Sequence, residues 1–251
     1  MLDITKFMQK YCVENMTEEE QQRYFIACLS GQRMNRYLRA CRGNKAQAIA
    51  LYRMNLRLGV ECFCLISYFE IVLRNAINRL YVQEHGPNWL KNATVENGIY
   101  SDVSCKQTRQ IIQTVLGKLE DPSHADVVAA LDLGFWRYQF AGTQFQAAGQ
   151  KLLQIFPNKP KSGKTQQYNH TYVFRQLGIV NDMRNRIAHH EPLCFAQGTA
   201  TIDLSSVKQC IAIIDELMEW LDIDQGIIFN DCNDRCESVI QEIEDFGRGK
   251  E

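Results

Sequence analysis

Residues 60–85 read VECFCLISYFEIVLRNAINRLYVQEH and contain neither glycine nor proline. Apolar residues recur in this stretch at steps of three and four positions, namely Leu65, Phe69, Val72, Ala76 and Leu80. That spacing lines one face of an α-helix, so the pattern predicts a long buried helix that ends at Gly86 and Pro87. Good helix formers from Asn44 to Leu58 allow the helix to begin earlier, with Gly59 as the weak position.

The same periodicity occurs elsewhere along the chain. An apolar stripe between residues 207 and 221 follows three candidate cap residues at 203, 205 and 206, and an acidic helix is expected from Asp231 to Phe246. Shorter helical signals cover Glu18 to Leu29, Gln107 to Leu119, Phe145 to Phe156 and Thr171 to His190. Sustained alternation typical of strands is absent, so we predict an all-α fold.

Composition places the chain in an ordinary globular class. Its 251 residues carry a net charge of −1, with 45% hydrophobic and 23% charged residues, which excludes disordered, collagen-like and membrane-spanning classes. We expect one helical domain over residues 1–222 and an acidic helical extension over 223–251. The N-terminus lacks a signal pattern, and charges interrupt the longest apolar-rich run, Leu56 to Leu73. A cytoplasmic protein without membrane contact is therefore expected.

Cysteines and histidines give no metal-ligand pattern. The ten cysteines include no CxxC pair, and those at 62 and 64 fall on different faces of the predicted helix. We interpret them as reduced, small hydrophobic side chains. The histidines are scattered, or adjacent at 189 and 190 without a carboxylate cluster, so we expect no metal ion and no other cofactor.

Basic residues are concentrated in two segments that contain no acidic residue, 31–57 and 133–181. Such a distribution fits local recognition of an anionic partner, or it reflects solvated helix faces. Charge alone leaves both interpretations open. The candidate contacts are Arg33, Arg36, Arg39 and Arg42 in the first segment and Lys159, Lys161 and Lys164 in the second.

The segment RNRIAHHEPL, residues 184–193, holds the candidate site. Pro192 biases Glu191 away from the α region, so the preceding helix should end near His190. Asn185 and His189 then lie one turn apart on one face, within reach of Arg184. Guanidinium, amide and imidazole together suit a phosphodiester. Alternatively, Arg and His in a last turn bond free carbonyls and complement the helix dipole, which is the commoner case.

This segment resembles the RNxxAHH signature of the Abi-like (abortive infection) proteins, a bacterial phage-defence group within the HEPN superfamily. Residues 68–77, YFEIVLRNAI, resemble the family's ExxLRNxI helix, and residues 131–140, LDLGFWRYQF, resemble its LxFGFW segment. The latter departs from the pattern, because Asp132 and Leu133 stand where a small polar residue and Phe-Gly are usual. Ser30 to Arg33 and the pair at 37–38 resemble the N-terminal block, so the resemblance spans roughly Ser30 to Leu193.

The resemblance implies a HEPN-type helical bundle with a long central helix and extra C-terminal helices. It also implies a metal-independent endoribonuclease in anti-phage defence. Arg184 and His189 match the RxxxxH positions, so Arg184 would hold the scissile phosphate, His189 would transfer protons and Asn185 would orient one of them. Glu70 and Arg74 would support the site as an ion pair, or simply solvate their helix face, and His190 is a further supporting candidate.

Related HEPN nucleases build a composite site across a two-fold axis, so the resemblance also implies a homodimer. Two other functions stay open. The first is an RNA-binding protein that keeps the pocket without turnover and grips a structured RNA with its basic helix. The second is an interaction protein that senses a phage component through its acidic tail. A regulatory protein or RNA partner would fit each of these.

Overall fold

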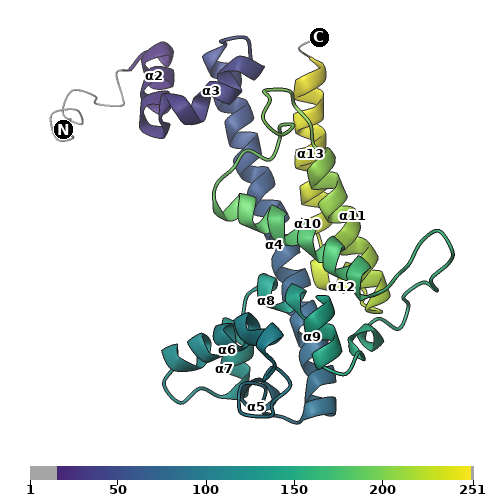
Figure 1. Cartoon of the computed structure of the whole chain (residues 1–251). Helices are drawn as coiled ribbons and strands as arrows, with labels where there is room; N and C mark the ends of the chain where they lie inside the picture. Colours follow the sequence, from purple (N-terminus) through teal and green to yellow (C-terminus); the bar gives the residue numbers. More distant parts are fainter. Residues whose placement is uncertain (1–15, 250–251) are drawn as a thin grey trace. The chain divides into compact units, whose positions relative to one another are not determined.

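The computed structural model describes residues 16–249, and this part of the chain is helical without a β-strand (Figure 1). This confirms the predicted all-α fold. Its α-helices are α2 (Glu18–Leu29), α3 (Gly31–Ala40), α4 (Lys45–His85), α5 (Trp89–Asn92), α6 (Lys106–Lys118), α7 (His124–Ala130), α8 (Leu133–Tyr138), α9 (Gly142–Ala147), α10 (His170–Ala188), α11 (Ser205–Trp220), α12 (Gln225–Phe229) and α13 (Cys232–Arg248). Short 3₁₀ turns occupy Val103–Cys105 and Leu152–Ile155.

The chain divides into two compact units. Within the described residues, the first unit comprises 16–60, 192–205 and 236–249, and the second comprises 61–191 and 206–235. Helices α4 and α13 each contribute residues to both units. The boundary expected at residue 222 does not coincide with any of these divisions.

The second unit is built around the C-terminal half of α4. Leu65, Phe69 and Ala76 of this half are buried, as their helical spacing predicted. An aromatic cluster lies beyond them, in which the ring of Trp89 is 4.7 Å from that of Tyr81 and 6.4 Å from that of Trp136. Edge-to-face contacts of this kind add to the apolar burial.

A half-buried amide supports this cluster. Asn78 Oδ1 accepts hydrogen bonds from Trp89 Nε1 and His124 Nε2, each at 2.8 Å. Because the amide oxygen can only accept, the His124 proton is on Nε2. Burial lowers the pKa of His124, which favours this neutral form.

In the first unit, Tyr37 of α3 packs edge-on against Tyr52 of α4 and against Phe195, with ring centroids 5.2 and 5.1 Å apart. The apolar stripe of α13 is buried here, including Val239 and Ile243. Helix α13 also forms an ion pair with α4, because Glu242 Oε2 lies 2.7 Å from Arg57 Nη1. Its acidic surface is therefore partly engaged inside this unit.

Most predicted helix ends are confirmed. Helix α2 has the predicted bounds and begins with a capping box at Thr17. Helix α4 takes the earlier start, since Asn44 Oδ1 caps it by accepting the N–H of Gln47 at 3.1 Å, and it ends where Gly86 adopts a φ of 89°. Both limits follow local chemistry that the sequence displays.

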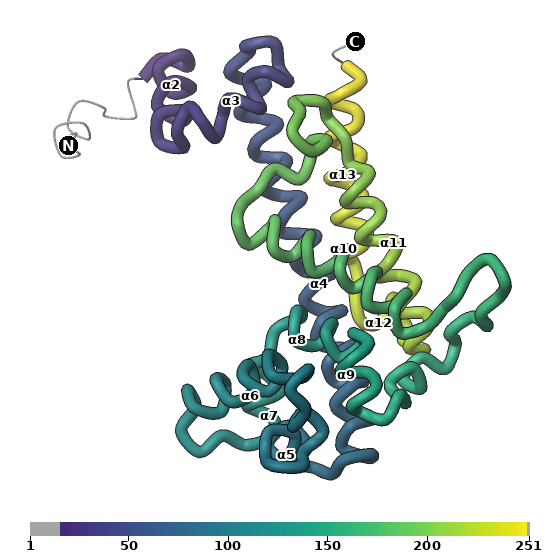
Figure 2. Tube along the Cα trace, in the orientation of Figure 1, coloured from purple at the N-terminus to yellow at the C-terminus, as the bar shows by residue number. Residues whose placement is uncertain are grey.

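The single helix predicted over Phe145 to Phe156 is wrong. Helix α9 stops at Ala147, because Gly149 and Gln150 adopt φ values of 85° and 61°. Two successive left-handed residues end an α-helix, and the chain resumes as a 3₁₀ turn. The following loop, residues 156–169, extends away from the helices of its unit (Figure 2).

None of the helices in the described range is both long and apolar enough to cross a membrane. The nine cysteines of residues 16–249 form no disulfide with one another, and among them Cys28 alone is exposed. Most of the others are buried, in line with the small hydrophobic role expected from their spacing. Cys12 lies outside the described residues.

Candidate functional site

The candidate site is at the C-terminal end of α10, which closes with a Schellman motif. Helix α10 ends at Ala188, and the N–H of His189 donates to the carbonyl of Asn185 at 3.0 Å. The N–H of Glu191 reaches back to the carbonyl of Arg186 at 2.8 Å, and His190 between them has a φ of 54°. Glycine usually occupies this left-handed position, so the backbone of His190 has a structural role. The helix thus ends where Pro192 predicted.

The side chains of Asn185 and His189 are exposed on one face of this helix end, and Arg184 beside them is half-buried. Arg184 Nη1 lies 3.5 Å from Asn185 Oδ1, at the outer limit of a hydrogen bond. Within residues 16–249, the imidazole of His189 makes no hydrogen bond or ion pair. The side chains of Arg184 and Asn185 are therefore neighbours, and the exposed His189 imidazole follows Asn185 by four positions, about one helical turn.

Arg186, by contrast, is engaged in holding the helix end. Its Nε lies 3.7 Å from Glu191 Oε2, and its Nη1 donates to Ser206 Oγ at 3.3 Å. These contacts tie the last turn of α10 to the first turn of α11. Arg186 therefore has a structural role at this helix end. Arg184, by contrast, has no carboxylate within 4 Å among the described residues.

Glu70 of α4 belongs to the same surroundings. Burial raises the pKa of its carboxyl, and the nearby negative charge of Asp132 acts in the same direction. The positive charges of Arg184 and Arg74 oppose that rise, as does the N–H of Leu133. Glu70 is thus half-buried and electrostatically coupled to Arg184, rather than being a purely solvated residue.

No ion pair within 4 Å joins Glu70 to Arg74 or to Arg184 in the part of the chain that the structure describes. The Nε of Arg74 is buried and lacks a hydrogen-bond partner there. A buried, unsatisfied guanidinium N–H is unfavourable unless another group meets it. These two residues therefore retain hydrogen-bonding capacity next to Arg184.

Two further polar residues, which the sequence analysis did not select, lie near Glu70 and Arg184. Asp132 Oδ1 caps α8 by accepting the N–H of Phe135 at 2.9 Å. A Cβ atom on Gly134 would lie 3.2 Å from that oxygen and 3.6 Å, an ordinary van der Waals distance, from Asn181 Oδ1, so Asn181 of α10 lies near the cap of α8. Asn181 precedes Asn185 by one helical turn, and this spacing would have placed it on the same helix face as Asn185. We call Glu70, Arg74, Asp132, Asn181 and Arg184 the polar cluster.

Arg137 sets the position of α8 against α10. Its Nε donates to the carbonyl of Phe174 at 3.2 Å, and its guanidinium lies 4.3 Å from the centre of the Phe174 ring. Gly178 makes room for this group, because a Cβ there would be 2.9 Å from Arg137 Nη2. The contact aligns the two helices that carry Asp132 and Arg184.

The predicted basic contacts lie in different units. Arg33, Arg39 and Arg42 are exposed in the first unit, and Arg36 is half-buried with its guanidinium 5.5 Å from the centre of the Phe195 ring. In the second unit, the loop lysines at 161 and 164 are exposed, whereas the one at 159 is half-buried and donates to the carbonyl of Pro160.

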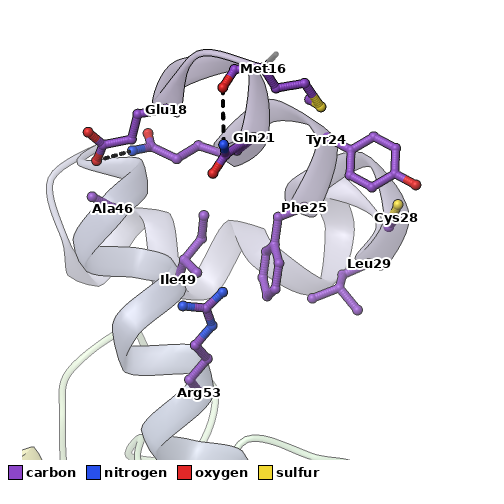
Figure 3. Close-up of a pocket in the computed structure, with 11 residues that line it drawn as sticks. Met16, Glu18, Gln21, Tyr24, Phe25, Cys28, Leu29, Ala46, Ile49 and Arg53 are labelled. Atoms are coloured by element: carbon purple, nitrogen blue, oxygen red, sulfur yellow. Dashed lines mark hydrogen bonds between the residues drawn. The ribbon is translucent and has the colours of Figure 1, made fainter. Parts of the chain in front are cut away.

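A groove that the sequence did not predict lies between α2 and the N-terminal turns of α4, with a volume of about 530 Å³ (Figure 3). Phe25, Leu29 and Ile49 line it, and Arg53 places its guanidinium 5.3 Å from the centre of the Phe25 ring. No histidine lines this groove, so it does not supply the acid–base groups of the candidate site.

Within the described residues, no cluster of three or more histidine, cysteine or carboxylate side chains is arranged to hold a metal ion. Comparisons of the chain with protein-family models, with curated proteins and with solved structures found no match. The functional argument therefore rests on the chemistry of the residues at the end of α10 and in the polar cluster.

Proposed function

We propose that the chain is a bacterial anti-phage protein of the Abi-like, HEPN type that cleaves RNA without a metal ion. The observation that carries this proposal is the arrangement at the end of α10, where Arg184 reaches Asn185 and the exposed, unengaged His189 imidazole follows Asn185 by one turn. Glu70 supports it from α4, through its electrostatic coupling to Arg184. The long helix α4 fits the central helix of a HEPN-type bundle.

The reaction uses the 2′-hydroxyl of RNA as an internal nucleophile. His189 removes the hydroxyl proton, the 2′-oxygen attacks phosphorus, and the bond to the 5′-oxygen breaks as that oxygen takes a proton. Arg184 neutralises the charge that develops on the phosphate, and Asn185 orients the phosphate or the imidazole. The products carry 2′,3′-cyclic phosphate and 5′-hydroxyl ends.

One chain supplies one Arg184–His189 pair, whereas the reaction needs both a base and an acid. We therefore propose a homodimer in which a second copy brings its own pair to the same phosphate. Light scattering is expected to show a dimer in the active fraction. A monomer that cleaves RNA at full rate would contradict this part of the proposal.

The deciding experiment incubates purified protein with total RNA and with DNA, with and without EDTA. Cleavage is expected on RNA alone, unaffected by chelation, with cyclic phosphate ends. His189→Ala should abolish cleavage and leave the melting temperature nearly unchanged, because the side chain is exposed. Gln113→Ala, at an exposed position of α6, is the control and should remain active. Cleavage of DNA, loss of activity on chelation, or an active His189→Ala variant would overturn the proposal.

Glu70→Gln separates a role in the site from a role in stability. Because the folded state raises the pKa of Glu70, the stabilising contribution of this group is present below its ordinary pKa and is lost as the pH rises through the folded value. Glutamine removes the unfavourable buried charge at pH 7, so thermal melts should show no loss of stability. Cleavage should nevertheless fall, since Arg184 loses its facing carboxylate.

A second candidate function is RNA binding without turnover, and the exposed arginines of α3 favour it. Neutralising Arg33, Arg36, Arg39 and Arg42 should weaken binding and flatten its salt dependence, which changes by about 0.7 in slope per single-strand phosphate contact. The matched control neutralises four exposed basic residues outside the basic segments: Arg79, Lys91, Lys106 and Lys118. Binding by an inactive wild type would favour this function.

A further inference from the structure

Two cysteines that are far apart in sequence meet in the second unit. Cys64 of α4 and Cys232, the first residue of α13, are separated by 168 positions, and their sulfur atoms lie 2.9 Å apart. Both are free thiols, Cys232 buried and Cys64 half-buried. A disulfide has a sulfur–sulfur bond of about 2.05 Å, so the two atoms need to approach by less than about 1 Å to bond.

A fixed cation faces one of the two sulfurs. Arg235 follows Cys232 by three residues, and its Nη2 donates to Cys232 Sγ at 3.0 Å. Its guanidinium is held by Glu61, at 2.9 Å from Nε, and by an ion pair with Asp231. The guanidinium therefore lies where it stabilises negative charge that develops on this sulfur during a reaction.

The other sulfur belongs to a thiol whose pKa is raised. Burial raises the pKa of Cys64 to about 11, and the adjacent Cys232 sulfur adds to the rise. Cys64 therefore keeps its proton at neutral pH and can donate its S–H to Cys232. Cys232, with the guanidinium beside it, is therefore placed to react first, and Cys64 is placed to react second.

We propose that Cys64 and Cys232 are a peroxide-oxidisable dithiol that closes to an intrachain disulfide. The Cys232 thiolate attacks hydrogen peroxide, a sulfur–oxygen bond forms, the oxygen–oxygen bond breaks, and hydroxide leaves and takes a proton. The Cys64 sulfur then attacks Cys232, loses its proton, and displaces the hydroxyl group as water. Two thiols and one peroxide thus give one disulfide and two waters, and the two electrons pass from sulfur to peroxide.

The disulfide would covalently join the first turn of α13 to α4 within the second unit. It closes a long loop, and cross-links of long loops restrict the unfolded chain most. Oxidised protein should therefore melt at a higher temperature than reduced protein. This inference does not depend on ribonuclease activity.

The test exposes the folded, full-length protein to hydrogen peroxide, blocks remaining thiols, and maps the peptides by mass spectrometry without reduction. A cross-link between the peptides containing Cys64 and Cys232, lost on reduction, is expected within one chain. Cys64→Ser should instead accumulate a sulfenic acid at Cys232 that dimedone traps, whereas Cys232→Ser should leave Cys64 a free thiol. Cys28→Ser, which removes the exposed thiol, is the matched control and should cross-link as the wild type does.

Three results would overturn the proposal. They are the absence of the cross-link when the exposed Cys28 is already oxidised, a cross-link between two chains, and a cross-link that forms only in denatured protein. Arg235→Gln adds an independent check, because loss of the cation beside Cys232 should slow disulfide formation by about tenfold at pH 7. An unchanged rate would assign Arg235 to the ion pairs alone and would contradict the proposed attack by Cys232.

Discussion

Replacing Asn55 with alanine probes how the segment after α10 is fastened to α4 in the first unit. Asn55 is 4% exposed, and its Oδ1 accepts the N–H of Leu193 at 2.7 Å and the N–H of Cys194 at 3.1 Å. Both donors belong to buried residues. Alanine cannot accept a hydrogen bond, so the substitution leaves two buried N–H groups without this partner.

The size of the effect follows from those two groups. Each stranded donor costs roughly 1–3 kcal/mol, which gives about 2–6 kcal/mol for the pair. Alanine is the better helix former and returns about 0.6 kcal/mol within α4. We therefore expect the free energy of unfolding to fall by roughly 1.5–5.5 kcal/mol.

Urea denaturation followed by circular dichroism measures this change. Asn75→Ala is the matched control, because Asn75 lies on the same helix with an exposed side chain. The control should change stability by less than about 0.7 kcal/mol, in the stabilising direction. If Asn55→Ala lost less than about 1 kcal/mol relative to this control, with an unchanged slope, the two hydrogen bonds would not be what fastens the segment.

Three shorter predictions concern backbone space, backbone strain and protonation. Gly98→Ala should lower the free energy of unfolding by about 2 kcal/mol or more in urea titrations, because the new Cβ would lie 2.3 Å from the carbonyl oxygen of Asn92. The control is Gly117→Ala, which has open space around it and should be neutral or stabilising. His190→Gly should raise the melting temperature, since glycine relieves about 1 kcal/mol of left-handed strain at a φ of 54°. Because burial lowers the pKa of His124, the neutral imidazole contributes stability above its ordinary pKa of about 6.5, and this contribution is lost as the pH falls through the folded value. Between pH 7 and pH 5, the melting temperature should therefore fall less for His124→Gln than for the wild type.

Helix positions were largely predictable from local sequence. The bounds of α2 and the start of α4 follow from cap residues, Thr17 and Asn44, that act within three positions along the chain. The end of α10 followed from Pro192 in the same way. Such helix ends can be predicted from the sequence because the interacting groups are only a few residues apart along the chain. The break after α9 was missed, since Gln150 does not signal a left-handed conformation by residue type.

Part of the candidate site was predictable for the same reason. Arg184, Asn185 and His189 lie within one and a half turns of one helix, so helical geometry alone brought them together. The contribution of Glu70 depends on α4 packing beside α10, and that of Asp132 depends on the cap of α8. The spacing of residues in the sequence does not predict which side chains from different helices lie close together.

Tertiary structure alone decided which polar groups are paired, buried or left open. Arg184 and Arg186 are two positions apart and have the same residue type, yet Arg184 belongs to the polar cluster and Arg186 binds Glu191 and Ser206. Cys64 and Cys232 gave no motif, because their contact closes a separation of 168 residues. Local patterns determine where helices begin and end, whereas the chemistry of a side chain depends on the charges and surfaces that distant segments place around it, and packing sets these.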